Sequence, residues 1–199
     1  MSRIVKVVSL VVVLASLAAV ATAAEKPAPP RMKPALVVMD VQNAFLPYMD
    51  EQDKKTGLET MNYVIALFRD NGFPVIRVYH TDPSEGPAPG TDAFEFPKTV
   101  AVKDDDPKVV KNFPDAFKKT DLDKVLHEKG VNTVFLAGLS GVGCVLATYF
   151  GAEDRDYQVF MVKHALISHD RALTKTVYDI CQNINYGSLK LLLETARAQ

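Results

Sequence analysis

Three residues, far apart in the chain, have the chemistry of an enzymatic centre: a carboxylate, an ammonium and a thiol. Asp40 ends the apolar run ALVVMD, Lys111 ends the run KVVK, and Cys144 follows the run NTVFLAGL. Each has an ordinary explanation alone, because an Asp after a strand often caps a turn, a Lys in an acidic loop is usually solvated, and a free Cys usually packs as a small hydrophobe. Together they would supply a base, a cation and a nucleophile.

The residues around Cys144 suggest how its thiol could be activated. A free thiol has a pKa of about 8.5 and is mostly protonated at neutral pH. The small residues SGVG precede Cys144 and a helical pattern follows it, which places the thiol at a helix start. A helix N-terminus and a neighbouring ammonium both favour the thiolate. The sequence therefore predicts a low pKa for Cys144.

The elements that must position these residues alternate between strands and helices. Strands are expected at 35–40, 75–80, 108–111, 132–139 and 157–163, and helices at 56–70, 120–130, 145–154 and 170–184. Residues 99–102 are a further candidate strand, and 187–196 fit either a strand or a helix. This alternation predicts a three-layer α/β/α, doubly wound, mainly parallel sheet. Ligands of such sheets bind beyond the carboxyl ends of the strands, where all three residues are expected.

The first 34 residues have the layout of an export signal followed by a spacer. Arg3 and Lys6 precede an apolar stretch that ends in Ala21-Thr22-Ala23, which predicts a secretory signal peptide over 1–23, cleaved after Ala23. Residues 24–34 form a Pro-rich tether and 35–199 a single domain. The expected location is periplasmic or secreted, without a membrane anchor after cleavage.

The charge of the mature chain excludes one class of partner. Removal of Arg3 and Lys6 from 23 basic residues leaves 21 against 24 acidic ones, a net charge of −3. No basic patch of the kind that binds nucleic acid follows from this balance.

Two cysteines, Cys144 and Cys181, could form one structural disulfide in an oxidising compartment. The helical pattern places Cys181 on one stripe with Val177, Ile180 and Ile184, away from the strand end that carries Cys144. Two free thiols are therefore the favoured expectation.

Three motifs in order resemble those of the isochorismatase-like cysteine hydrolases, a family that includes nicotinamidases and N-carbamoylsarcosine amidase. The motif VVMDVQNAF carries Asp40, Gln42 and Phe45; the lysine motif carries Lys111, Phe117, Thr120, Asp121 and Leu122; the nucleophile motif carries Gly138, Cys144, Val145 and Thr148. The resemblance implies a triad of Asp40, Lys111 and Cys144, and a cis peptide at Leu139-Ser140. It also implies an oxyanion hole from the N–H groups of Ser140 and Cys144, and a homo-oligomer.

Some residues depart from the family pattern. No Asp/His cluster like that of nicotinamidases occurs between residues 46 and 75, so no metal and no other cofactor is expected. Gly141 stands where the family often has Thr, and His164 where it usually has an acidic residue. Phe45 and His80 are the leading candidates for substrate contacts, followed by Tyr79, Phe113 and Tyr149. The loop 81–107 is expected to set the substrate together with a neighbouring subunit.

The function that follows is an exported cysteine hydrolase with a small-molecule substrate. It would cleave a C–N bond of a small amide, carbamoyl or imide compound through a Cys144 thioester. Two alternatives remain open at this stage. One is a relative that has lost turnover and serves as a binding or structural oligomer. The other is an enol-ether hydrolase of the isochorismatase type, which would leave Cys144 without a role.

Overall fold

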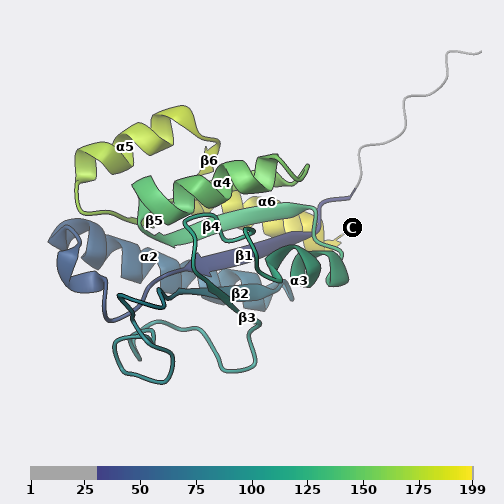
Figure 1. Cartoon of the computed structure of the whole chain (residues 1–199). Coiled ribbons are helices and arrows are strands. Elements are labelled where there is room, and N and C mark those ends of the chain that lie inside the picture. Colours follow the sequence, from purple (N-terminus) through teal and green to yellow (C-terminus); the bar gives the residue numbers. More distant parts are fainter. Residues whose placement is uncertain (1–30, 199) are drawn as a thin grey trace, which may run out of the picture. The chain divides into compact units, whose positions relative to one another are not determined.

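A six-stranded, all-parallel sheet forms the middle of the protein in a computed structural model that describes residues 31–198 (Figure 1). The strands are β1 (Pro34–Met39), β2 (Val75–His80), β3 (Lys108–Lys111), β4 (Thr133–Leu139), β5 (Gln158–Ile167) and β6 (Asn183–Ile184). Their order is β3-β2-β1-β4-β5-β6. The direction of winding therefore reverses between β1 and β4, which is where such sheets bind ligands.

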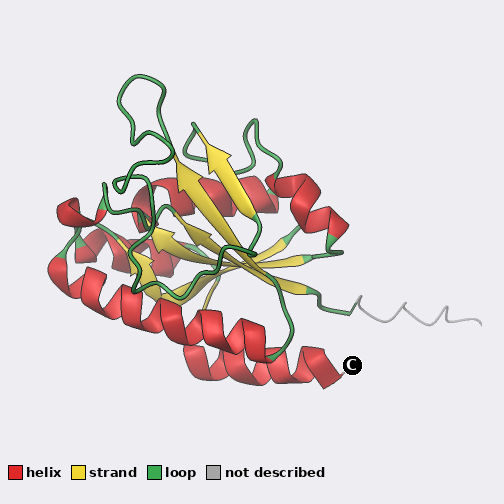
Figure 2. Cartoon of the chain, turned by 90° about the horizontal axis from the view of Figure 1, so that it is seen from below, coloured by secondary structure: helices red, strands yellow, loops and turns green. Residues whose placement is uncertain are grey.

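Helices cover both faces of the sheet, as predicted (Figure 2). They are η2 (Leu46–Tyr48), α2 (Glu51–Asp70), α3 (Leu122–Glu128), η3 (Gly141–Val145), α4 (Leu146–Glu153), α5 (Arg171–Ile180) and α6 (Tyr186–Ala198). Val37 and Met39 of β1 pack in the core under α3 and α4, whereas Leu36 and Val38 pack in the core under α2 and α6. Strands buried on both faces explain the unbroken apolar runs. None of the described helices is both long and apolar enough to cross a membrane.

The predicted elements differ from the structure mainly at their ends. Helix α2 begins at Glu51 rather than 56, because the Asp50 side chain caps it by accepting from the N–H groups of Gln52 and Asp53. Strand β5 extends past 163 to Ile167 through an irregularity in its pairing with β4, where His164 has φ 66°. Residues 99–102 form no strand, and the C-terminal segment is the helix α6.

The segment 170–184 contains a shorter helix than predicted. Helix α5 ends at Ile180, Cys181 follows it as a buried residue, and Ile184 belongs to β6. The prediction that Cys181 shares one helical stripe with Ile180 and Ile184 is therefore wrong, since Ile180 is largely exposed. Both Cys144 and Cys181 are free thiols. The expected signal peptide and most of the tether lie outside the described residues, and Pro34 already belongs to β1.

Candidate active site

Asp40 follows the last residue of β1 and lies beside the end of β4. Its backbone has φ 55°, a left-handed conformation that Asp tolerates better than most residues, and its N–H donates to the Val78 carbonyl of β2 at 2.9 Å. The two central strands come very close here, since a Cβ on Gly138 would lie 2.1 Å from the Met39 carbonyl oxygen. Only glycine fits position 138, which also has φ 119°. The Asp40 side chain is buried at this junction.

Cys144 lies in the tight turn that connects β4 to α4. The Leu139-Ser140 peptide is cis, as the family resemblance implied, and the turn Gly141–Val145 is a π-helix. The N–H groups of Gly143 and Val145 both donate to the Ser140 carbonyl. The Ser140 N–H has no hydrogen-bond partner among the described residues, so it is available at the start of the turn. This turn leaves the Cys144 thiol only partly buried.

Lys111, the last residue of β3, reaches the other two across β2. Its Nζ lies 2.7 Å from Asp40 Oδ2, 3.1 Å from Cys144 Sγ and 3.1 Å from His80 Nδ1. The contacts with Cys144 and His80 are hydrogen bonds, and the contact with Asp40 is an ion pair. The side chain is 0% exposed. Lys111 is therefore a buried member of the triad and not the solvated lysine that an acidic loop usually carries.

The lysine and nucleophile motifs hold each other in place behind the triad. The buried Thr148 hydroxyl of α4 accepts from the Ala116 N–H at 2.9 Å. A Cβ on Gly151 would lie 2.5 Å from Asp115 Oδ1, so the loop after β3 packs directly on α4. Thr120 donates to the Ala116 carbonyl and accepts from the Leu122 N–H, which leads the loop into α3. The motif residues outside the triad therefore fix its geometry.

Burial disfavours the charged forms of both the thiol and the carboxyl in the ligand-free site. Burial and then the Asp40 charge raise the pKa of Cys144 to about 11, although Lys111 opposes this. Burial also raises the pKa of Asp40, again against the effect of Lys111. The predicted low-pKa thiolate is therefore wrong for the free site, because desolvation and a neighbouring carboxylate outweigh the ammonium and the helix start.

His80, at the end of β2, is held from two sides. Gln42 accepts from the His80 N–H at 2.7 Å and donates to the His80 carbonyl at 2.9 Å. Burial and the Lys111 charge lower the pKa of His80, so the ring is neutral near pH 7. Because Lys111 can only donate, His80 Nδ1 accepts and the ring proton lies on Nε2. The Phe45 ring packs at 6.0 Å from the His80 ring.

These residues surround a cavity of about 250 Å³ at the carboxyl ends of β1, β2 and β4. Its lining residues are Asp40, Phe45, Met49, His80, Leu139, Ser140 and Cys144. Phe45 and His80 line this cavity, and their contact with substrate stays a prediction. Sequence reasoning missed Met49 and Leu139, although both sit close in sequence to residues it had selected.

The other candidate contacts lie elsewhere. Tyr79 is buried in a stack with Phe94 and Phe96, and the Tyr149 hydroxyl accepts from the Gln182 N–H. Phe113 packs under the ammonium of Lys118 at 4.3 Å. No residue of the loop 81–107 lines the cavity in the described chain, and the expectation that this loop sets the substrate together with a neighbouring subunit stays a prediction. The loop supports the segment after β1, since the Ala93 carbonyl accepts from the Ala44 N–H.

The same side chains offer a set of metal-binding atoms. Ligand atoms of Asp40, His80 and Cys144 lie within 4.8 Å of one another. The Lys111 ammonium contacts all three, so it occupies the position that a cation would need. These residues do not fit a resident metal unless Lys111 moves away, and the absence of a metal stays a prediction.

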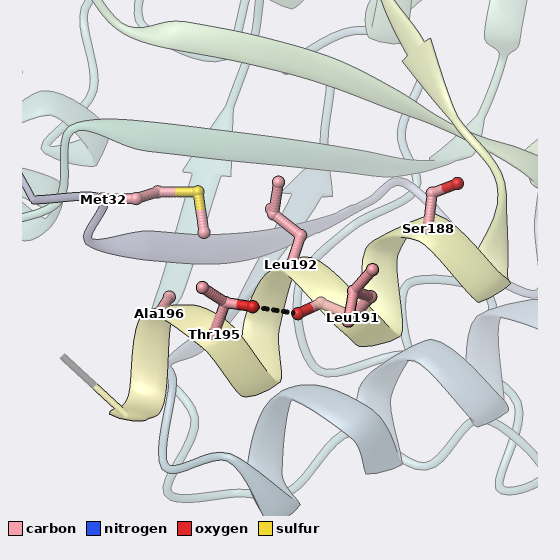
Figure 3. A pocket seen from close by; sticks show the side chains of 6 residues that line it. All are labelled: Met32, Ser188, Leu191, Leu192, Thr195 and Ala196. Atoms are coloured by element: carbon pink, nitrogen blue, oxygen red, sulfur yellow. Dashed lines mark hydrogen bonds between the residues drawn. The ribbon is translucent and has the colours of Figure 1, made fainter.

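A larger cavity, of about 320 Å³, lies beside α6 and the residues that lead into β1 (Figure 3). Its lining residues are Met32, Ser188, Leu191, Leu192, Thr195 and Ala196. None of them titrates, and the Thr195 hydroxyl already donates to the Leu191 carbonyl at 2.8 Å. Size alone therefore does not identify the reactive site.

Comparisons with known proteins identify the family of this chain. The Isochorismatase domain family matches residues 34–184. YddQ, an uncharacterised isochorismatase family protein of Bacillus subtilis, is 29% identical over 141 residues, which cover 67% of this chain and 77% of YddQ. N-carbamoylsarcosine amidase from Thermoplasma acidophilum is 27% identical with a TM-score of 0.68, over 77% of this chain and 95% of the amidase. A cysteine hydrolase from Pseudomonas syringae pv. phaseolicola is 20% identical with a TM-score of 0.71, over 86% of this chain and 97% of the hydrolase. The chain belongs to the isochorismatase-like hydrolase family, with Asp40, Lys111 and Cys144 arranged as its triad.

Proposed function

We propose that this protein is an exported hydrolase that cleaves a C–N bond of a small amide, carbamoyl or imide compound through a Cys144 thioester. One observation carries the proposal: the Lys111 ammonium contacts both the Asp40 carboxylate and the Cys144 sulfur at the wall of one cavity. A nucleophile, a base and a cation in contact are what covalent acyl transfer requires. The 27% identity to an N-carbamoylsarcosine amidase supports a C–N bond as the one cleaved.

The first half of the reaction forms the thioester. Asp40 removes the thiol proton as the sulfur attacks the carbonyl carbon, and the thiolate charge that develops is stabilised by Lys111. A buried carboxyl with a raised pKa is a stronger base than a solvated one, which suits this transfer. Protonated Asp40 then donates the same proton to the leaving nitrogen. The C–N bond breaks and an acyl group remains on Cys144.

The second half hydrolyses the thioester. Asp40 takes a proton from a water molecule that attacks the acyl carbon, and the C–S bond breaks. The proton passes back to the sulfur, which restores the thiol and the carboxylate. In both halves the carbonyl oxygen becomes negative, and we assign its stabilisation to the N–H groups of Ser140 and Cys144. One such donor contributes about 3 kcal/mol to a transition state.

Export and self-association belong to the same proposal. The positive, apolar and small-residue regions of residues 1–23 support cleavage by a signal peptidase after Ala23. Exposed Tyr48, Tyr63, Ile180 and Leu191 offer apolar surface to a second copy of the chain. The mass of the exported protein would test the cleavage site, and light scattering would test the oligomer.

The test of activity is an ammonia-release screen of the chain that starts at Ala24. The screen covers small amides, ureas and imides, with Cys144→Ala alongside. Ammonia release that needs Cys144 supports the proposal, and the acyl-enzyme would add the acyl mass to the intact protein. Release that persists in Cys144→Ala, or no ammonia from any amide or urea together with no cleavage of any imide to its amide and acid, would contradict it.

A further inference from the structure

The cavity beside the triad has apolar walls and no spare positive charge. Phe45, Met49 and Leu139 supply its apolar surface, and no Arg or Lys is among its lining residues. The nearest cation, Lys111, lies behind Asp40, His80 and Cys144 and is in contact with all three. A carboxylate on a substrate would therefore find no unused cationic partner here.

The charges already present at the site also disfavour an anionic substrate. The Lys111 ammonium offsets the Asp40 carboxylate, His80 is neutral, and the thiol is neutral in the free site. The site is thus electrically balanced before substrate enters. An anionic substrate would add an unpaired negative charge beside buried Asp40, which costs far more than burying a neutral group.

Two side chains of the cavity wall offer unused neutral donors: the Ser140 hydroxyl, which has no hydrogen-bond partner among the described residues, and the His80 ring. His80 Nδ1 accepts from Lys111, which leaves the proton on Nε2, and Nε2 has no hydrogen-bond partner among the described residues. Gln42 fixes the backbone of His80 through two hydrogen bonds, so the ring is held at the cavity wall. An uncharged acceptor atom of a bound molecule would satisfy this N–H.

We infer that the cavity selects uncharged substrates with a small apolar body, oriented by the Nε2–H of His80, and rejects carboxylate-bearing ones. This inference rests on the proposed function, since it names the class of amide that the triad would attack. It makes dicarboxylates such as an isochorismate-type enol ether poor substrates. His80 is then a residue that determines specificity, distinct from the three that carry the reaction.

Iodoacetamide and iodoacetate provide a test that does not depend on turnover. The two reagents are nearly the same size and alkylate the same thiol, but only iodoacetate is negatively charged. The experiment measures the rate at which each reagent alkylates Cys144 in a Cys181→Ala variant. The ratio of the iodoacetamide rate to the iodoacetate rate is then divided by the same ratio measured for free glutathione. We expect a corrected preference for iodoacetamide of at least ~30-fold. A corrected ratio near one would overturn the inference, even if amides are hydrolysed.

A cation placed in the cavity should reverse the preference. Met49→Arg adds a charge at the wall, and Met49→Gln is its uncharged control. We expect iodoacetate to react at least ~10-fold faster with Met49→Arg than with Met49→Gln. Equal rates in the two variants would contradict the electrostatic argument.

The role of His80 is tested with His80→Gln and His80→Leu. Gln keeps a donor and Leu does not, so iodoacetamide, which has a carbonyl acceptor, should react about tenfold more slowly with His80→Leu than with His80→Gln. Allyl bromide has no such acceptor and should react at similar rates with both. A parallel loss for both reagents would indicate that His80 acts only by supporting Lys111.

Discussion

Two apolar cavities in the part of the chain that the structure describes differ in their chemistry, since only the one beside the triad is lined by groups that can react. The cavity beside α6 is larger, at about 320 Å³ against about 250 Å³, but its polar groups are hydroxyls and none of its lining residues titrates. The smaller cavity lies where the winding reverses between β1 and β4. Because the carboxyl ends of several strands meet there, residues distant in sequence are brought into contact. Strand topology, more than volume, identifies the reactive cavity.

The largest expected effect separates the two cavities by activity. Cys144→Ala removes the nucleophile and should lower turnover of any amide substrate found by at least ~1,000-fold. Leu191→Ala at the α6 cavity should leave turnover within about twofold, because Leu191 is largely exposed and contacts no reacting group. Steady-state ammonia release measures both. A large loss in Leu191→Ala would show that the two cavities are coupled.

Much of this site could be predicted from the sequence because its residues lie at or near the ends of strands, which apolar runs mark. Asp40, Lys111 and Cys144 each sit at or just after an apolar run, and parallel pairing alone brings such positions together. Phe45 and His80 could be found for the same reason. The cis peptide at Leu139-Ser140 came from the family resemblance, since no local pattern specifies one.

The features that the sequence did not predict depend on distances that only the folded chain defines. Burial of Lys111 follows from its reach across β2 to Asp40, and an isolated acidic loop around KVVK gives no sign of it. The pKa of Cys144 was predicted in the wrong direction because the helix start is visible in the sequence, whereas desolvation is not. Met49 and Leu139 were missed because apolar side chains at a cavity wall look like ordinary core residues.

The second prediction compares two lysines at the two ends of β3. Lys111 is 0% exposed and paired with buried Asp40, whereas Lys108 packs over the Tyr79 ring and lies only 3.8 Å from Glu95. Lys111→Met leaves an unpaired buried carboxylate and should lower the free energy of unfolding by about 3–5 kcal/mol. Lys108→Met should lower it by no more than about 1 kcal/mol. Urea denaturation of both variants measures the difference.

A second substitution shows where the cost of Lys111→Met comes from. Adding Asp40→Asn to Lys111→Met removes the unpaired charge and should recover more than half of the lost stability. Turnover should remain at least ~100-fold below the wild-type value in both variants, since each lacks the cation. A Lys111→Met variant that is as stable as Lys108→Met would contradict the structural role of the buried pair.

The third prediction compares the effect of an added methyl group in the turn that carries Cys144 with its effect in α6. A Cβ on Gly141 would lie 2.9 Å from Ser168 Oγ, and one on Gly187 would come no closer than 3.5 Å to Asn185 Oδ1. Gly141→Ala should therefore cost about 1–2 kcal/mol of unfolding free energy, whereas Gly187→Ala should be neutral or stabilising. Both values come from urea denaturation.

Ser168 makes the third prediction specific. Its hydroxyl is buried and has no hydrogen-bond partner among the described residues, so Ser168→Ala alone should change the unfolding free energy little. In the double variant with Gly141→Ala, the clash disappears and most of the lost stability should return. Additive effects of the two substitutions would show that the cost of Gly141→Ala arises from Leu166 or from the turn itself.

The smallest expected effect is a pH dependence that belongs to the triad cavity alone. The pKa of His80 lies below its ordinary value of 6.5 in the folded protein, because of burial and Lys111. Below pH 6.5 the unfolded chain therefore binds a proton at this position that the folded chain does not. The contribution of His80 to the unfolding free energy falls as the pH is lowered from 6.5 toward the folded pKa.

Asp40 affects the unfolding free energy in the opposite direction and in a different pH range. Its pKa in the folded protein is raised above the ordinary 3.8, so its ionisation lowers the unfolding free energy as the pH rises from that value.

The difference in unfolding free energy between wild type and His80→Gln separates the two contributions, because Gln still accepts from Lys111. We expect this difference to shrink as the pH is lowered from 7 to 5, measured by urea denaturation at each pH. Leu192→Ala, at the α6 cavity, should lower the unfolding free energy by the same amount at every pH, because no lining residue there titrates. A constant difference for His80→Gln would mean that the histidine takes up its proton equally in the folded and unfolded chains, and the assignment of Nδ1 as an acceptor for Lys111 would fall with it.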